Sequence, residues 1–270
     1  MRYAICNELF QGWDHRRVVD YVAAAGYTGL EIAPYTLAEH VDEITPARRR
    51  ELRTIAEDRG IAITGLHWLL VKPPGLHICH PDAAVRTRTA DYLRRLVDLC
   101  GDLGGAVMVF GSPNQRKIAA DLPRADAVGW AREVFASCGP TAAARGVTLC
   151  LEALPEDLTN FLNTNAEVRE SVAAIGHPNI QMMIDVKSMC AESIPVPDNI
   201  RACAGVFRYV HANDSNLKGP GFGAVDYAPI AATLRDVGYD GWISVEVFNY
   251  DEGPEFIATK SLEYLRRVVG

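Results

Sequence analysis

The sequence predicts a single (β/α)8 barrel, an α/β fold in which eight parallel strands form a closed cylinder surrounded by helices. Its 270 residues match the roughly 250 that this fold requires. Eight short apolar segments alternate along the chain with longer segments of helical periodicity. The first apolar segment is not followed by a G-x-G-x-x-G motif, which argues against an open doubly wound sheet. No linker or internal repeat divides the chain, so we expect one domain over residues 1–270.

The expected strands are rich in apolar and β-branched residues and alternate only weakly between apolar and polar positions. This pattern is typical of parallel strands that are buried on both faces. The strands are expected at residues 3–6, 29–32, 61–67, 106–110, 147–151, 180–185, 206–212 and 242–248.

The helices expected between these strands carry recognisable end signals. Asp14 is the expected N-cap of the first helix, and Gly26 follows its last residue. Thr45 and Pro46 begin the second helix, with threonine as the cap and proline at the first helical position. The helices are expected at residues 14–25, 45–60, 82–100, 126–144, 165–174, in a short segment after Pro197, and at residues 226–236 and 254–269.

Composition excludes several functional classes. Lysine and arginine number 27 against 34 aspartates and glutamates, so the net charge of −7 opposes nucleic-acid binding, which uses a basic surface. No apolar segment reaches the roughly 18 residues that a membrane-spanning helix requires. The seven cysteines are odd in number, irregularly spaced and without a Cys-x-x-Cys pair. We therefore expect reduced thiols without a catalytic role, in a cytoplasmic protein.

Ionisable residues stand at the ends of the last four expected strands, where Glu152, Asp185, His211 and Glu246 each terminate an apolar segment. Because the carboxyl ends of parallel strands meet at one rim of a barrel, these residues are expected to converge. Three buried carboxylates repel one another unless a cation neutralises them, so we predict one divalent metal ion. Oxygen ligands with a single nitrogen favour Mn²⁺, with Mg²⁺ or Co²⁺ as alternatives. A metal-free acid–base pair of Glu152 and Glu246 is the other interpretation.

The four strand-end residues resemble the metal site of the xylose isomerase-like TIM barrel superfamily. This group includes sugar isomerases, ketose 3-epimerases, inosose dehydratases and endonucleases of the endonuclease IV type. The chain is most similar to the sugar phosphate isomerase/epimerase branch, and the similarity spans its whole length. Further matching stretches are residues 29–33, 65–68, 103–105, 111–113, 159–164 and 211–214.

The resemblance implies a metal-dependent isomerase or epimerase of carbohydrate metabolism. Such an enzyme removes a proton next to the carbonyl of a keto sugar through a metal-stabilised enediolate. In ketose epimerases two glutamates act on opposite faces of the substrate, and their counterparts here are Glu152 and Glu246. Both are therefore expected to be catalytic as well as metal ligands.

Three other functions stay open at this stage. The same enediolate could lose a substituent, which would make the enzyme a lyase, dehydratase or decarboxylase of an oxidised sugar or inositol derivative. An abasic-site endonuclease is disfavoured, because that relative uses many histidines and this acidic chain has only seven. A non-catalytic sugar-binding barrel would leave the set of acidic residues unexplained.

The chain departs from the ketose 3-epimerase pattern at three positions. Ser188 stands where a histidine is expected, Leu158 where a glutamate is expected, and Leu217 where an arginine is expected. The metal site is thus expected to be intact while the contacts to sugar hydroxyls have changed. This difference favours a modified or oxidised sugar as the substrate.

Several residues near the strand ends are candidates for binding this sugar. Lys187 lies two residues past Asp185 and would point to the same side of an extended chain, where it is expected to contact an anionic or enolate oxygen. His67 could equally be a packed core histidine, and Glu31 a structural acid. The partner is expected to be a small sugar, with no nucleic acid or membrane and with a homodimer left open. The full set of substrate-binding candidates is His67, Trp68, Lys187, Lys218, Phe248 and Glu31.

Overall fold

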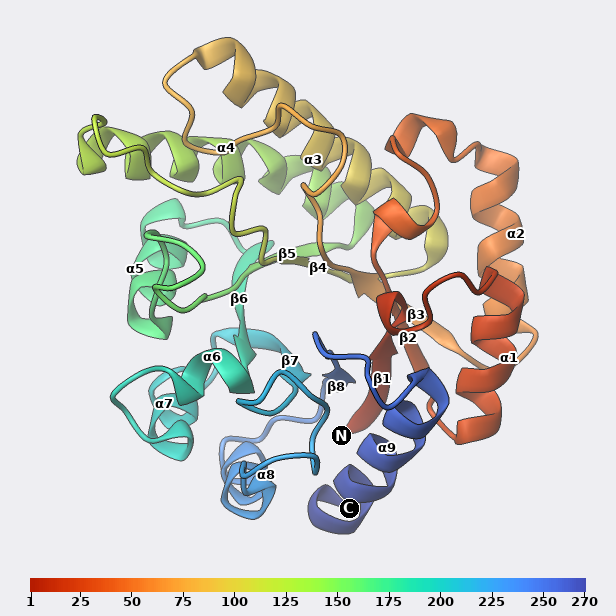
Figure 1. The fold of residues 1–270 in the computed structure, drawn as a ribbon. Helices are drawn as coiled ribbons and strands as arrows, with labels where there is room; N and C mark the ends of the chain where they lie inside the picture. The colour runs from red at the N-terminus through yellow and green to blue at the C-terminus, as the bar shows by residue number, and fades with distance from the viewer.

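The computed structural model describes all 270 residues and contains a closed barrel of eight parallel strands in sequential order, as predicted. Figure 1 looks along the barrel, with the strands at the centre and the helices around them. Pairing of β1 with β8 closes the cylinder. The strands are β1 (Arg2–Cys6), β2 (Gly29–Ile32), β3 (Ala62–Leu66), β4 (Val107–Phe110), β5 (Thr148–Leu151), β6 (Ile180–Asp185), β7 (Phe207–Ala212) and β8 (Trp242–Val245).

Nine α-helices and three short 3-10 helices connect and cover the strands. The α-helices are α1 (His15–Ala25), α2 (Pro46–Glu57), α3 (Ala83–Leu103), α4 (Arg124–Arg145), α5 (Asn165–Ile175), α6 (Val186–Cys190), α7 (Val196–Ala202), α8 (Tyr227–Asp236) and α9 (Pro254–Val269). The 3-10 helices cover Asn7–Leu9, Pro34–Thr36 and Val41–Glu43. None of the helices combines the length and the apolar character needed to cross a membrane.

The predicted N-caps of the first two helices are confirmed. The Asp14 carboxylate accepts a hydrogen bond from the Arg17 backbone N–H at 2.9 Å. The Thr45 hydroxyl accepts one from the Arg48 N–H at 3.2 Å, with Pro46 at the first helical position. These side chains satisfy backbone donors that have no partner within the helix.

Among the differences from the prediction, three element boundaries and one additional helix are informative. Helix α3 continues to Leu103 because Gly104, with φ of 86°, is the left-handed residue that ends it. Helix α7 begins at Val196, before the proline that was expected to precede it. Strand β8 ends at Val245, which leaves Glu246 just beyond the strand. Helix α6 was not predicted, because its N-cap, Asp185, is also the last residue of β6.

The inside of the barrel has its own small apolar cluster below the carboxyl ends of the strands. It comprises Val107, Val109, Cys150, Met183 and Tyr209, which come from β4 to β7. The opposite faces of these strands pack against the helices in the main core. Because side chains alternate along a strand, the next inward positions after this cluster are those at the strand ends. The alternation thus directs the strand-end residues into the mouth of the barrel.

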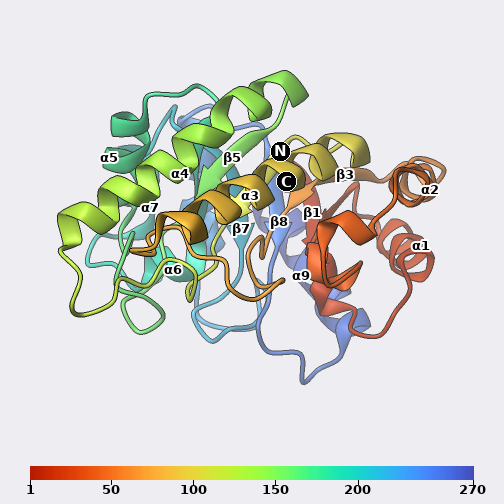
Figure 2. The ribbon, with the colours of Figure 1, turned by 90° about the horizontal axis from the view of Figure 1, so that it is seen from above.

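The two chain termini meet at the amino end of the strands. The Tyr3 hydroxyl donates to the Gly270 carbonyl at 2.9 Å. Figures 1 and 2 both show the termini side by side, and in Figure 2 the longer loops after β7 and β8 lie at the opposite end. The carboxyl ends of the strands lie at that opposite end, which is where barrels of this fold have their active sites.

Candidate metal centre

Four buried ionisable side chains meet at the carboxyl end of the barrel. Glu152, Asp185, His211 and Glu246 each offer one atom, and these atoms all lie within 4.8 Å of one another. They come from the ends of β5, β6, β7 and β8. Each follows an inward-facing residue by two positions, so the alternation of side chains along the strands brings them together.

The charges of this group, and two buried atoms in it that lack hydrogen bonds, fit a divalent cation. Nδ1 of His211 and Oε2 of Glu246 lie 3.1 Å apart, yet both are buried and neither makes a hydrogen bond. Burial and the nearby charges of Glu246 and Asp185 raise the pKa of Glu152 to about 8. A cation would satisfy the two atoms and relieve the repulsion among the three carboxylates. Three oxygen donors and one nitrogen suit a hard or borderline metal ion rather than a thiolate-bound one.

A hydrogen-bond network holds Asp185 in place. One carboxylate oxygen accepts from the Ser188 backbone N–H at 2.6 Å, and the other accepts from the Asn213 side-chain amide at 2.5 Å. The Asn213 oxygen in turn accepts from the Lys187 N–H at 2.8 Å. The Tyr227 hydroxyl accepts from the Asn213 backbone N–H at 2.9 Å and donates to its carbonyl at 2.7 Å. The sequence did not reveal these roles of Asn213 and Tyr227, since neither side chain is a metal ligand.

His211 is oriented from below by Glu31 of β2. Both oxygens of the Glu31 carboxylate lie near Nε2 of His211, at 3.1 and 3.2 Å. Burial opposes ionisation of Glu31, but His211 and His67 lower its pKa to about 2. A charged carboxylate at Nε2 favours a proton there and leaves Nδ1 free for a metal ion. Glu31 lies beneath the metal centre rather than on the wall of the pocket described below.

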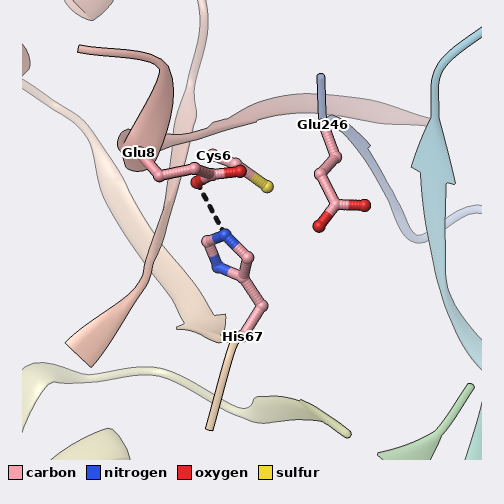
Figure 3. Close-up of side chains that lie close together, drawn as sticks. All are labelled: Cys6, Glu8, His67 and Glu246. Carbon is pink, nitrogen blue, oxygen red and sulfur yellow. Dashed lines mark hydrogen bonds and ion pairs between the residues drawn. The ribbon is translucent and has the colours of Figure 1, made fainter. Parts of the chain in front are cut away.

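A second cluster shares Glu246 with the metal centre. Figure 3 shows Cys6, Glu8 and His67 pointing with Glu246 toward one space. His67 and Glu8 are already partners, because Nε2 and Oε2 lie 2.6 Å apart. Burial and the charge of Glu31 raise the pKa of the Cys6 thiol to about 12, which disfavours the thiolate form that binds metals. The group of Glu152, Asp185, His211 and Glu246 is therefore the better metal site.

Arg116 and Gly111 fix the position of Glu152. The Arg116 side chain is fully buried and donates to the backbone carbonyls of Glu152 and Phe110, both at 2.7 Å. Burial lowers the pKa of this guanidinium to about 10, so it is charged at neutral pH. At Gly111, a Cβ atom would lie 2.0 Å from Oε2 of Glu152. The carboxylate thus occupies space that only glycine leaves open.

A pocket opens above the metal centre. Glu152 and Glu246 lie in its charged part together with His67 and Lys187, and all four side chains are buried. Lys187 is 9% exposed, and its ammonium lies 4.7 Å from the centre of the Phe248 ring without any ion pair. The remaining lining residues are Trp68, Val109, Gly111, Pro113, Leu154, Leu158, Leu217 and Phe248.

The predicted sugar-binding residues divide into two sets. His67, Trp68, Lys187 and Phe248 line the pocket. The extended backbone expected at Lys187 is wrong, since it lies in the first turn of α6, but its side chain still reaches the pocket. Lys218 does not line the pocket and instead forms an ion pair with Glu252. Glu31 contacts His211, as described above.

Comparison with known proteins gives a consistent group of relatives. Residues 19–268 match the family model described as xylose isomerase-like TIM barrel. The chain is 28% identical to a D-psicose 3-epimerase of Agrobacterium fabrum over 250 residues, 87% of this chain and 82% of the relative. It is 30% identical to a D-psicose 3-epimerase of Enterocloster bolteae over 241 residues, 87% and 77% of the two chains. A crystal structure of D-psicose 3-epimerase with D-tagatose from Clostridium cellulolyticum H10 has a TM-score of 0.89 at 22% identity, covering 100% and 99% of the chains.

The contact between Gly111 and Glu152 yields a prediction for metal binding. The Gly111→Ala substitution is expected to weaken Mn²⁺ binding at least about tenfold, because the new methyl group displaces the Glu152 carboxylate. Gly111 does not have a left-handed backbone, so alanine should leave the fold intact. Calorimetric titration of chelator-treated protein with Mn²⁺ measures the effect. Gly129→Ala, where a Cβ has open space, is the matched control, and equal affinities in the two variants would contradict the prediction.

Proposed function

The chain belongs to the xylose isomerase-like TIM barrel family, and from this premise we propose that it is a metal-dependent isomerase or epimerase of a keto sugar. The observation that carries the proposal is the convergence of two glutamates, one aspartate and one histidine, with both glutamates lining a single pocket. The D-psicose and L-ribulose 3-epimerases among its relatives support the same reaction type. The carbon next to the ketone is the expected site of reaction.

Glu152, Asp185, His211 and Glu246 would hold one divalent ion, for which we propose Mn²⁺ because the donors are three carboxylates and one imidazole. When bound, the ion supplies a Lewis acid that stabilises negative charge on the oxygens of the substrate. Asn213 keeps Asp185 directed at this point, and Glu31 does the same for His211. The protein thus fixes the donor atoms through contacts on the side away from the pocket.

Glu152 and Glu246 perform the proton transfers. They come from β5 and β8, which are separated in the barrel by β6 and β7. A substrate between them presents one face to each carboxylate. One glutamate removes the proton from the carbon next to the carbonyl, and the other returns a proton to the opposite face, which inverts that carbon. The apolar rings of Trp68 and Phe248 line the same pocket and limit access of water.

Lys187 binds an oxygen of the substrate that carries or develops negative charge. Its ammonium is buried beside the two glutamates but forms no ion pair. A buried cation without a counter-charge is costly, and the ring of Phe248 compensates for it only in part. An anionic oxygen of the substrate in the pocket would supply the missing counter-charge to the Lys187 ammonium.

We also propose that the protein works in a reducing compartment such as the cytoplasm. All seven cysteines are free, and six of them are buried. Disulfides form and persist mainly in oxidising compartments.

Exchange of a carbon-bound proton with solvent tests the proposed reaction directly. The Mn²⁺-loaded protein is expected to incorporate deuterium from D2O next to the ketone of D-fructose or D-psicose, with no loss of a substrate group. Glu246→Gln should lower the exchange rate at least about 100-fold, since it removes a proton-transfer group. The exposed Glu57→Gln serves as the control. Absence of exchange with every ketose tested, or release of a fragment of the substrate, would contradict the proposal.

Removal of the Lys187 charge tests its proposed contact with the substrate. Lys187→Met keeps the length and apolar stem of the side chain and removes its charge. We expect kcat/KM for the exchanging substrate to fall at least about tenfold, because hydrogen bonds to charged groups contribute roughly 1.5–3 kcal/mol. Lys260→Met, on the exposed face of α9, is the matched control. An unchanged kcat/KM in Lys187→Met would exclude the contact.

A further inference from the structure

The pocket above the metal centre is charged at its floor and apolar along one wall. We define the apolar wall as Trp68, Pro113, Leu154, Leu158, Leu217 and Phe248. Apart from the indole N–H of Trp68, none of these side chains can donate or accept a hydrogen bond. A free ketose carries a hydroxyl group on every carbon other than the carbonyl. Placing those hydroxyls against the apolar wall would remove them from water without giving them partners, which is unfavourable.

Two leucines of the apolar wall are exposed to solvent at the opening of the pocket. Leu158 is 41% exposed and Leu217 is 46% exposed. The ketose 3-epimerase pattern that the chain resembles has a glutamate and an arginine at these two positions, and both are leucine here. The wall is therefore apolar up to the opening of the pocket.

The backbone at Leu217 is held in an unfavourable conformation. Its φ of 71° lies in the left-handed region, which leucine rarely adopts. Its carbonyl accepts hydrogen bonds from the N–H groups of Phe248 at 2.8 Å and Asn249 at 2.9 Å. Its own N–H donates to the Asp214 carbonyl at 3.0 Å. These bonds join Leu217 to Phe248 and hold an exposed leucine over the pocket, which is the kind of strain found at ligand-binding positions.

We propose that the substrate is a keto sugar derivative carrying an alkyl or aryl group, and that this group packs on the apolar wall. The inference rests on the proposed function, because it places the carbonyl and the neighbouring hydroxyl at Glu152 and Glu246. Leu158 and Leu217 then determine specificity. Trp68 and Phe248, whose rings meet edge to face at 6.4 Å, provide the deeper part of the contact.

Ketoses that differ only in an apolar group test the proposal. The probes are D-fructose, 1-O-benzyl-D-fructose and 6-O-benzyl-D-fructose, with kcat/KM for solvent deuterium incorporation as the readout. At least one benzyl ether is expected to exceed D-fructose tenfold or more, within the roughly 10–200-fold range of apolar pocket contacts. Leu217→Asn and Leu158→Gln should each reduce this preference at least about fivefold. Asparagine adopts the left-handed backbone conformation found at position 217 more readily than leucine does, so Leu217→Asn should fold.

The matched control is Ile194→Asn, which replaces an equally exposed apolar residue, 43% exposed, outside the pocket. Its preference should equal that of the unsubstituted protein. Faster exchange of D-fructose than of both benzyl ethers, or a preference that persists in both leucine variants, would overturn the proposal.

Calorimetric binding of the benzyl ethers to the Mn²⁺-loaded protein separates this inference from the proposed function. Binding that Leu217→Asn weakens about tenfold, without exchange of any ketose, would support the apolar wall and refute the proposed reaction. Exchange of D-fructose without any advantage of the benzyl ethers would refute the apolar wall and support the reaction. Absence of both binding and exchange would overturn both.

Discussion

The structure depends on three buried carboxylates held close together at the end of a barrel. Glu152, Asp185 and Glu246 repel one another, and within the chain His211, His67, the buried Arg116 guanidinium and the raised pKa of Glu152 relieve part of that repulsion. The neighbouring residues hold this group together, through the hydrogen bonds of Asn213 and Arg116 and the space left at Gly111. Such an arrangement is stable and useful when a divalent cation shares the carboxylates.

The convergence of Glu152, Asp185, His211 and Glu246 could be predicted from the sequence because it follows from local rules. Each of the four residues lies at or just beyond the end of an apolar strand, and strand alternation with parallel closure of the barrel brings such ends together. The supporting contacts could not be predicted, since they join distant parts of the chain. Glu31 reaches His211 across 180 residues, and Asn213 reaches Asp185 across 28. Helix α6 was missed because Asp185 ends a strand and caps a helix at once.

The floor and the wall of the pocket have separate roles in this account. In the proposed function the floor carries the proton-transfer groups Glu152 and Glu246 and the candidate metal site. At positions 158 and 217 the wall has leucines, where the ketose 3-epimerase pattern has a glutamate and an arginine. Reaction type and substrate choice can therefore change independently, as in other barrels whose loops vary around a constant rim. Lys187, which belongs to the unpredicted helix α6, lies where floor and wall meet.

Metal titration decides whether Glu152, Asp185, His211 and Glu246 hold a divalent ion. Chelator-treated protein and its Asp185→Asn variant would be titrated calorimetrically with Mn²⁺. Asparagine can still cap α6, so the variant removes a negative charge and a ligand while keeping the fold. The exposed Asp198→Asn is the control. We predict one site per chain, weakened at least about 100-fold by Asp185→Asn and unchanged by Asp198→Asn, in line with or beyond the 10–100-fold effect of outer-shell substitutions. Absence of binding, or equal affinity in the Asp185→Asn variant, would contradict the account.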